Sequence, residues 1–529
     1  MSTDQRKSGF NPDDRARVSL AVVITLFGKL LEMSQGLSVL LALHLFGAVV
    51  FGLFGIAYSV AEILIRFLLG GFGDAVVFFA ARYAGQPDLK EDKEQRRQRE
   101  GALYRSLATC IWVPLALSLV IVAALHLGSR AIYDCFFAAQ QPPELISLVI
   151  TMSWILPLAV LVRLPAEATK AYLDMRWAVF ISDGLIPAAT LAAIPVMWLL
   201  DYGAMGLVYA FLIPYGLALP LAWYGFSRHF RLGPTLAAVM RCQVHLPVLG
   251  FAAPQSLNMM CNFGLVRIDS LMLAVWYPPE RVAIYIAVSD LFRAIRAAQT
   301  SFATVFAPLV SRYQARANRV GLSEALDSIA RASAALSIPI ALVLLAFYSD
   351  LIAGPGKPWT ESRYFTWLLA LSPLLSCFYG FAGNLLLMTG HPRLLLGNSS
   401  LLVAVNIALN ALLIPDHGLV GAALATATSS AMLAAVQVWQ MMVLEGIRFA
   451  AGLHRRTIIS ALMPTMAVAV LSLPGVTELL YGHGLILGLA IKIALVFFCV
   501  AVYGASMLAW PAPNPFRTWL DERRRRRGR

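Results

Sequence analysis

The sequence predicts an all-α polytopic membrane protein with about fourteen transmembrane helices. Apolar residues make up 59% of its 529 positions and charged residues only 13%, well below the charged share of an ordinary soluble chain. Apolar runs that approach or exceed the roughly 20 residues needed to cross a bilayer recur along the whole chain. Lys and Arg are concentrated in alternate loops between these runs.

The apolar runs give the expected spans in order. The first stretch is too long for the core of a signal peptide and lacks a small-residue cleavage site, so we take it as the first span. The expected spans lie near residues 18–43, 47–70, 104–127, 145–168, 177–200, 205–226, 246–276, 282–311, 332–353, 363–389, 394–415, 418–445, 456–475 and 482–509.

The net charge of +13 comes from the basic loops. By the positive-inside rule these loops are cytoplasmic, which places both termini in the cytoplasm and requires an even number of spans. The tail Arg523–Arg527 is expected to lie against anionic lipid headgroups, and no nucleic-acid partner is expected. The opposite loops hold only Arg130, Arg281, Lys357 and Arg363.

An internal repeat relates two parts of the chain. Residues 57–83 align without gaps on residues 287–313, with Arg66 on Arg296 and Arg82 on Arg312. A second match, DYGAMGLVYA from Asp201 to DHGLVGAALA from Asp416, places Gly203 on Gly418. Both matches shift the chain by six spans, so the two halves share one orientation and are related by an axis along the membrane normal. The predicted domains are an N-lobe (1–227), a C-lobe (228–445) and two further spans with a basic cytoplasmic tail (446–529).

Several motifs carry a family resemblance. They are a Gly47-x4-Gly52-Leu53 pattern, GGFG at 70–73, PLVSR at 308–312, LMTGHPR at 387–393 and PDHGLVGAALAT at 415–426. With these residues the chain, over about 17–445, resembles the multidrug/oligosaccharidyl-lipid/polysaccharide (MOP) exporter superfamily, and within it the oligosaccharide flippases.

The resemblance implies a V-shaped pair of parallel six-helix lobes that open alternately to the two sides of a bacterial inner (cytoplasmic) membrane. Its substrate would be a polyprenyl-pyrophosphate-linked oligosaccharide, a repeat unit of polysaccharide or O-antigen type, moved outward while its lipid tail stays in the bilayer. Spans one, two, seven and eight line the cavity in such proteins. Membrane lipids and the polysaccharide polymerase machinery are the implied partners, and no catalytic activity is implied.

Ionisable residues inside the expected spans are costly, so they are the candidate site residues. Three pairs are spaced for contact on one helical face: Lys29 with Glu32, Glu62 with Arg66, and Asp290 with Arg293. Each pair either neutralises itself or serves the substrate. Arg267 and Asp269 are two residues apart and cannot pair locally, and Arg296 has no acidic neighbour that Arg293 does not already claim.

Arginine stays protonated and binds phosphate oxygens through two N–H groups at once. We therefore hypothesise that a pyrophosphate or an acidic sugar binds Arg66, Arg267, Arg293 and Arg296, with Lys29. Candidates for charge pairing or for coupling to protons or sodium are Glu32, Glu62, Asp269 and Asp290. Lys492 in the last span either joins the cavity or a groove for the lipid tail, or it snorkels or pairs with Asp183 or another acid. The Gly70, Gly71 and Gly73 cluster, Pro254 and Pro308 would allow bends.

Two other functions were considered. A cation-coupled multidrug exporter of the same superfamily would use Glu32 or Asp269 as its proton or sodium site. A membrane-bound glycan polymerase or ligase would need a large exterior catalytic loop, whereas the longest here, near Gly128–Glu144, has few polar residues. The chain has no nucleotide-binding loop motif and no metal-ligand spacing of His or Cys, so no cofactor is expected.

Overall fold

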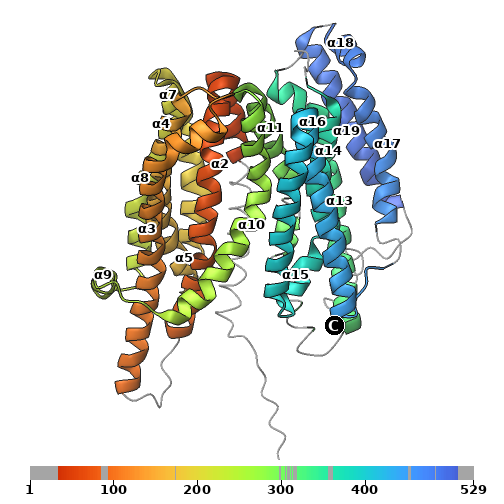
Figure 1. Cartoon of the computed structure of the whole chain (residues 1–529). Coiled ribbons are helices and arrows are strands. Elements are labelled where there is room, and N and C mark those ends of the chain that lie inside the picture. Colours follow the sequence, from red (N-terminus) through yellow and green to blue (C-terminus); the bar gives the residue numbers. More distant parts are fainter. Residues whose placement is uncertain are drawn as a thin grey trace, which may run out of the picture. The chain divides into compact units, whose positions relative to one another are not determined.

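The computed structural model describes residues 34–84, 93–172, 174–296, 299–303, 306, 310, 313, 319–354, 361–450, 454–482 and 484–509. Every regular element among these residues is helical, and the chain forms two compact units that divide after Ile286. Figure 1 shows long helices lying side by side within each unit. The predicted all-helical, multi-pass membrane fold is confirmed.

Unit 1 is built from helices on both sides of a central long helix, α2, which contacts most of the others. Its elements are α2 (Ser34–Ala84), α3 (Lys93–Phe136), α4 (Glu144–Ser153), α5 (Ile155–Ala168), the 3₁₀ turn η1 (Thr169–Tyr172), α6 (Arg176–Val179), the π-helical turn η2 (Phe180–Leu185), α7 (Ile186–Leu199), α8 (Gly203–Ser227), α9 (Leu232–Met240) and α10 (Leu246–Trp276). Helix α11 (Pro279–Phe292) crosses the division between the units.

Unit 2 contains the remaining helices. They are the 3₁₀ turn η3 (Arg293–Arg296), α13 (Arg319–Ile352), α14 (Arg363–Tyr379), α15 (Phe381–Met388), α16 (Pro392–Leu444), α17 (Arg455–Leu471), α18 (Pro474–Gly482) and α19 (Leu485–Ala509). The C-terminal helices α17 and α19 pack against α13, as Figure 1 shows in blue and green. The two predicted extra spans therefore attach to unit 2.

The observed helices follow the predicted spans. Among the described residues, eight helices are long and apolar enough to cross a membrane, or up to eleven if each of three bent helix pairs is one span. Two of the eight, α2 and α16, are each interrupted by one glycine outside helical geometry, Gly47 and Gly418. The breaks lie next to predicted boundaries between neighbouring spans. The count of fourteen and the V-shaped arrangement stay predictions.

Gly203 and Gly418, which the repeat aligns, have nearly the same positive φ. Gly203 has φ 54° and begins α8, and Gly418 has φ 55° at the break inside α16. Positive φ of this kind costs a side chain energy but costs glycine none. Each glycine lies at the start of a predicted span, Gly203 in span six and Gly418 in span twelve. These are the two spans that the sequence match aligns.

Glycines of α2 bring it close to neighbouring elements, α10 above all. A Cβ added to Gly70 would lie 2.5 Å from the Cβ of Met259, and one added to Gly71 would overlap the main chain at Ala252. Small residues of this kind let membrane helices approach closely. The predicted bend at the 70–73 cluster is wrong, because Gly47 is the residue of α2 with non-helical φ/ψ.

Helix α10 does bend, by 53° between Leu246–Gly264 and Arg267–Trp276, and thus ten residues beyond the predicted position at Pro254. Pro308 lies outside the described residues.

Because α10 packs so closely on α2, the compact unit extends to Ile286 and takes in the predicted seventh span. The predicted lobe boundary at 227/228 refers to the sequence repeat, and it stays a prediction.

Candidate functional site

The centre of the candidate site in unit 1 is the carboxylate of Glu62 on α2. Arg267 of α10 donates from Nε to Oε2 of Glu62 over 2.6 Å, and Nη2 of Arg66 lies 3.8 Å from Oε1. Glu62 and Arg267 are buried, whereas the side chain of Arg66 is 33% exposed. One carboxylate thus faces two guanidinium groups that come from different helices.

Aromatic rings hold both guanidinium groups. The Cζ atom of Arg66 lies 3.8 Å from the ring centroid of Phe263, and that of Arg267 lies 5.6 Å from the ring centroid of Tyr58. Cation–π contacts of this kind stabilise a charge that has lost its water. The aromatic faces leave the edges of the guanidinium groups for anionic oxygens.

The register of α2 against α10 places these residues together. Moving four residues along α2 moves the contact four residues back along α10, as expected when i±4 ridges of two antiparallel helices interdigitate. The contacts in this row are Glu62 with Arg267, Arg66 with Phe263, Gly70 with Met259, Asp74 with Gln255, and Phe78 with Phe251. The charged pair is therefore one step of a continuous helix–helix interface.

Asp269 of α10 is contacted by a residue of the next helix. Its Oδ2 accepts a hydrogen bond from the hydroxyl of Tyr285 on α11 over 2.7 Å, and the carboxylate is almost fully buried. Arg267, which the spacing predicts not to pair with Asp269 along the helix, pairs with Glu62 of α2.

In unit 2 the candidate residues lie where α11 passes into η3. Arg293 donates from Nη2 to Oδ1 of Asp290 over 2.5 Å, so the predicted local pair forms. Arg296 is exposed at the end of the 3₁₀ turn and makes no ion pair within the described part of the chain. Lys29 and Glu32 lie outside the described residues.

Lys492 of α19 is fully buried and pairs with Asp350 of α13, with Nζ 2.5 Å from Oδ2. The hydroxyl of Tyr481 donates to the other oxygen of the same carboxylate over 3.0 Å. The acid that the sequence left open is therefore Asp350 and not Asp183. This cluster joins α18 and α19 to α13.

One partly buried cation inside a predicted span was missed from the sequence. Arg163 lies inside the predicted fourth span, on α5, and donates from Nη2 to the hydroxyl of Tyr215 on α8 over 2.9 Å. Asp183, in the π-helical turn η2, lies close enough to interact electrostatically with it. A search for every charge inside the predicted spans would have found Arg163.

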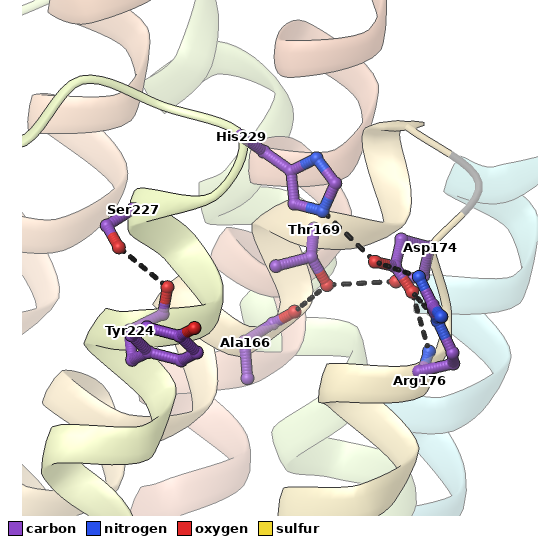
Figure 2. Close-up of polar contacts among 7 residues, drawn as sticks. All are labelled: Ala166, Thr169, Asp174, Arg176, Tyr224, Ser227 and His229. Carbon is purple, nitrogen blue, oxygen red and sulfur yellow. Dashed lines mark hydrogen bonds and ion pairs between the residues drawn. The ribbon is translucent and has the colours of Figure 1, made fainter.

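A polar cluster lies at one end of unit 1, which is the cytoplasmic end in the predicted orientation. In Figure 2, Arg176 donates from Nε and Nη2 to the two carboxylate oxygens of Asp174, at 2.9 and 3.2 Å, and His229 Nε2 donates to Oδ2 over 3.1 Å. Burial raises the pKa of Asp174, but the hydrogen bonds from Arg176 and His229 outweigh it and hold that pKa below its usual value. The cluster ties α5, α6 and the end of α8 together.

The searched part of the chain, namely the described residues, contains no group of three or more His, Cys, Asp or Glu side chains that could hold a metal ion. The site chemistry on view is that of guanidinium and carboxylate groups. Such a site can bind and exchange anions.

Solved structures with similar folds are transporters. The chain resembles the lipid II flippase MurJ in an inward closed conformation, with a TM-score of 0.65 and 14% identity, over 92% of this chain and 98% of that chain. It also resembles a multidrug resistance MATE family transporter of the MOP superfamily in an inward-facing conformation, with a TM-score of 0.63 and 12% identity, over 80% of this chain and 98% of that chain. At these identities the likeness establishes the fold, which is the fold that the resemblance in the sequence implies.

A search of curated protein sequences finds no match. The family profile described as polysaccharide biosynthesis protein matches residues 89–362, which is more than half of the chain. The fold is one that the chain shares with solved transporters. The chain is a multi-pass membrane protein that belongs to the polysaccharide biosynthesis protein family.

Proposed function

We propose that the protein moves a polyprenyl-pyrophosphate-linked oligosaccharide from the cytoplasmic to the outer leaflet by alternating access. The observation that carries this proposal is the Glu62 carboxylate held by Arg66 and Arg267, because it shows an anion bound by two arginines inside an apolar helical unit. A pyrophosphate would use the same donors. The family described as polysaccharide biosynthesis protein supports a glycan as the remainder of the substrate.

Arginine suits this task better than lysine. Its planar fork of donors matches two phosphate oxygens, and its pKa is too high for it to lose its charge when it is desolvated. Arg293 and Arg296 of unit 2, and Lys29, are further proposed contacts for the pyrophosphate or for an acidic sugar. The glycan and the lipid chain need no charged partner.

The setting of the protein belongs to the same proposal. A lipid-linked oligosaccharide is made on the cytoplasmic face, so we place the protein in a bacterial inner membrane with both termini inside, as the distribution of basic residues favours. A polymerase that consumes the exported repeat unit is the expected partner. Proton or sodium coupling, through Glu32, Glu62, Asp269 or Asp290, is the expected energy source.

The test is export of the lipid-linked glycan by single variants. Arg267→Ala and Arg296→Ala should each abolish export at normal protein levels, because each removes one of the charged donors proposed to bind the pyrophosphate. Arg130→Ala is the matched control: this arginine is exposed on α3 beyond the predicted third span, so its loss should leave export unchanged. Wild-type export by both site variants would contradict the proposal.

A cation-coupled multidrug exporter is the second candidate. The buried Asp269 carboxylate with its Tyr285 donor favours it, because such a carboxylate can exchange a proton during transport. Transport of organic cations that depends on a proton gradient and is lost in Asp269→Asn, with no effect of Arg296→Ala, would support this alternative over the first.

A further inference from the structure

We propose that unit 1 carries a sugar-binding subsite, formed where the C-terminal part of α2 meets the N-terminal part of α10, that recognises the glycan of the substrate. Its residues are Asp74, Phe78, Phe251 and Gln255. This inference rests on the proposed function, because one lipid-linked oligosaccharide would occupy the arginine site and this subsite together. It separates the residues that recognise the sugar from those that bind the pyrophosphate.

Two stacked aromatic rings form the apolar part of the subsite. The ring centroids of Phe78 and Phe251 are 5.3 Å apart, and the ring planes differ by only 6°. Both side chains are exposed, Phe78 by 48% and Phe251 by 40%. The C–H face of a sugar ring packs on an aromatic ring of this kind, while the hydroxyl groups at its rim stay available for hydrogen bonds. The ring pair therefore offers a surface that suits a sugar.

A carboxylate and an amide lie one helical turn from the rings. Gln255 donates from Nε2 to Oδ2 of Asp74 over 3.0 Å, and the Asp74 side chain is exposed. A carboxylate can accept about four hydrogen bonds, and an amide both donates and accepts, so their mutual bond leaves capacity on each. A sugar hydroxyl group also donates and accepts. Asp74 and Gln255 therefore present the groups that neighbouring hydroxyls of a sugar need.

The end of α5 adds further polar groups to this face. Glu167 of α5 and Lys170 of η1 form an ion pair, and both lie close enough to Asp74 to interact with it electrostatically. Their side chains are 26% and 28% exposed. Charged groups that face lipid are costly. The face that gathers charges from α2, α5 and η1 is therefore suited to water or to a polar ligand.

The spacing fits one ligand that spans both sites. Arg66 and Asp74 lie on one side of α2, eight residues or about 12 Å apart along the regular helix. A pyrophosphate at Arg66 that carries a short oligosaccharide can reach Asp74 along this row. On α10 the amides of Asn258 and Asn262 are bonded to each other over 3.0 Å, and they continue the polar surface from Gln255 toward the level of Arg66.

The experiment compares two probes on the purified full-length protein by isothermal titration calorimetry. One probe is a short-chain polyprenyl-pyrophosphoryl disaccharide of glucose, and the other is the ethyl ester of the same polyprenyl pyrophosphate, which carries the charge but no sugar. We expect the wild type to bind the disaccharide probe about tenfold more tightly than the ethyl ester, an effect of the size of one charge-assisted hydrogen bond.

Single variants assign this preference to the subsite. Asp74→Asn should reduce it to about twofold, because hydrogen bonds to a neutral amide are weaker than those to a carboxylate. Phe78→Leu should reduce it to about threefold, whereas Phe78→Tyr keeps the aromatic face and should keep the preference. The affinity for the ethyl ester should stay at the wild-type value in all three variants, which also shows that each is folded.

Asp134→Asn is the matched control. Asp134 is an exposed acid near the other end of α3, so this variant should bind both probes as the wild type does. If Asp74→Asn does not fold, the comparison of Phe78→Leu with Phe78→Tyr decides the matter.

Two failures can be told apart. Equal affinity of the wild type for the two probes, or a wild-type preference in both Asp74→Asn and Phe78→Leu, overturns the sugar-binding subsite and leaves the proposed function standing. No binding of either probe by the wild type overturns both.

Discussion

The two arginines that the repeat aligns, Arg66 in unit 1 and Arg296 in unit 2, have different surroundings. Arg66 lies on a regular helix, one turn after Glu62, with its guanidinium group over Phe263. Arg296 ends a 3₁₀ turn and is exposed. In the same alignment the residue that corresponds to Glu62 is Phe292, which is buried and carries no charge. Arg66 and Arg296 are therefore aligned cations, but only Arg66 follows an acidic residue by one helical turn.

The difference lies in how the charge near each aligned arginine is paired. Near Arg66 the buried pair is interhelical, Glu62 with Arg267, so it depends on the close packing of α2 on α10. Near Arg296 the pair of Asp290 and Arg293 is local, and one segment can form it without a neighbouring helix. We expect substitutions in unit 1 to affect stability and transport together, and substitution of Arg296 to affect transport alone.

The largest expected effect is that of Arg267→Ala on stability. Removing this guanidinium group leaves the buried Glu62 carboxylate without its 2.6 Å partner, which should lower the free energy of unfolding by about 3–5 kcal/mol. Arg296→Ala removes an exposed side chain and should change it by less than about 0.5 kcal/mol. Thermal unfolding of the purified proteins in detergent measures both.

The double variant Glu62→Gln/Arg267→Gln provides the control for this comparison. It removes both charges, so it should recover part of the stability that Arg267→Ala loses, while export stays abolished. Equal losses of stability in Arg267→Ala and Arg296→Ala would show that the two arginines are held in the same way, and the contrast between the units would fail.

Much of the fold was predictable from the sequence. Apolar runs and loop charges predicted the helices, and the turn glycines Gly203 and Gly418 appear in the repeat because a backbone with positive φ selects that residue type. The bend at Gly70 and Gly71 was predicted wrongly, because a glycine in a membrane helix serves either a bend or a close helix contact, and the sequence does not distinguish them.

Of the contacts in the candidate site, the sequence predicted only those between residues of the same helical segment. The spacing rules found Glu62 with Arg66 and Asp290 with Arg293, since these partners lie within one turn. The pair of Glu62 with Arg267 joins residues on different helices, and only the register of α2 against α10 defines it. The same holds for Lys492, whose partner Asp350 lies on α13.

A smaller effect is expected for the buried pair of unit 2 that joins two helices. Lys492→Met should destabilise the protein by about 3 kcal/mol, because the buried Asp350 carboxylate loses its cation and keeps the neutral hydroxyl of Tyr481 as a donor. The double variant Lys492→Met/Asp350→Leu should be closer to the wild type in thermal unfolding, because no unpaired charge remains buried.

Export by that double variant separates the two roles considered for Lys492. If the pair only joins α19 to α13, export should stay near the wild-type level when the protein is present in normal amounts. Loss of export from a stable double variant would instead favour a groove for the lipid tail, and it would show that an interhelical pair in unit 2 also serves the substrate.

The smallest expected effect is a pH-dependent one, at the Asp174 cluster of unit 1 (Figure 2). Because the pKa of Asp174 is lower in the folded protein than its ordinary value of 3.8, its ionised form stabilises the fold above about pH 4, and this contribution is lost as the pH falls through the folded pKa. Asp174→Asn keeps the bond from Thr169 Oγ1 to the main-chain oxygen, so it should cost only about 1 kcal/mol near pH 7, and progressively less as the pH falls through the folded pKa of Asp174 toward about pH 2. Thermal unfolding of both proteins between these pH values measures the difference. A difference in stability that does not change with pH would mean that the ion pairs of Asp174 with Arg176 and His229 add no stability. Of the two paired sites compared in unit 1, the pair of Glu62 with Arg267 would then be the one that stabilises it.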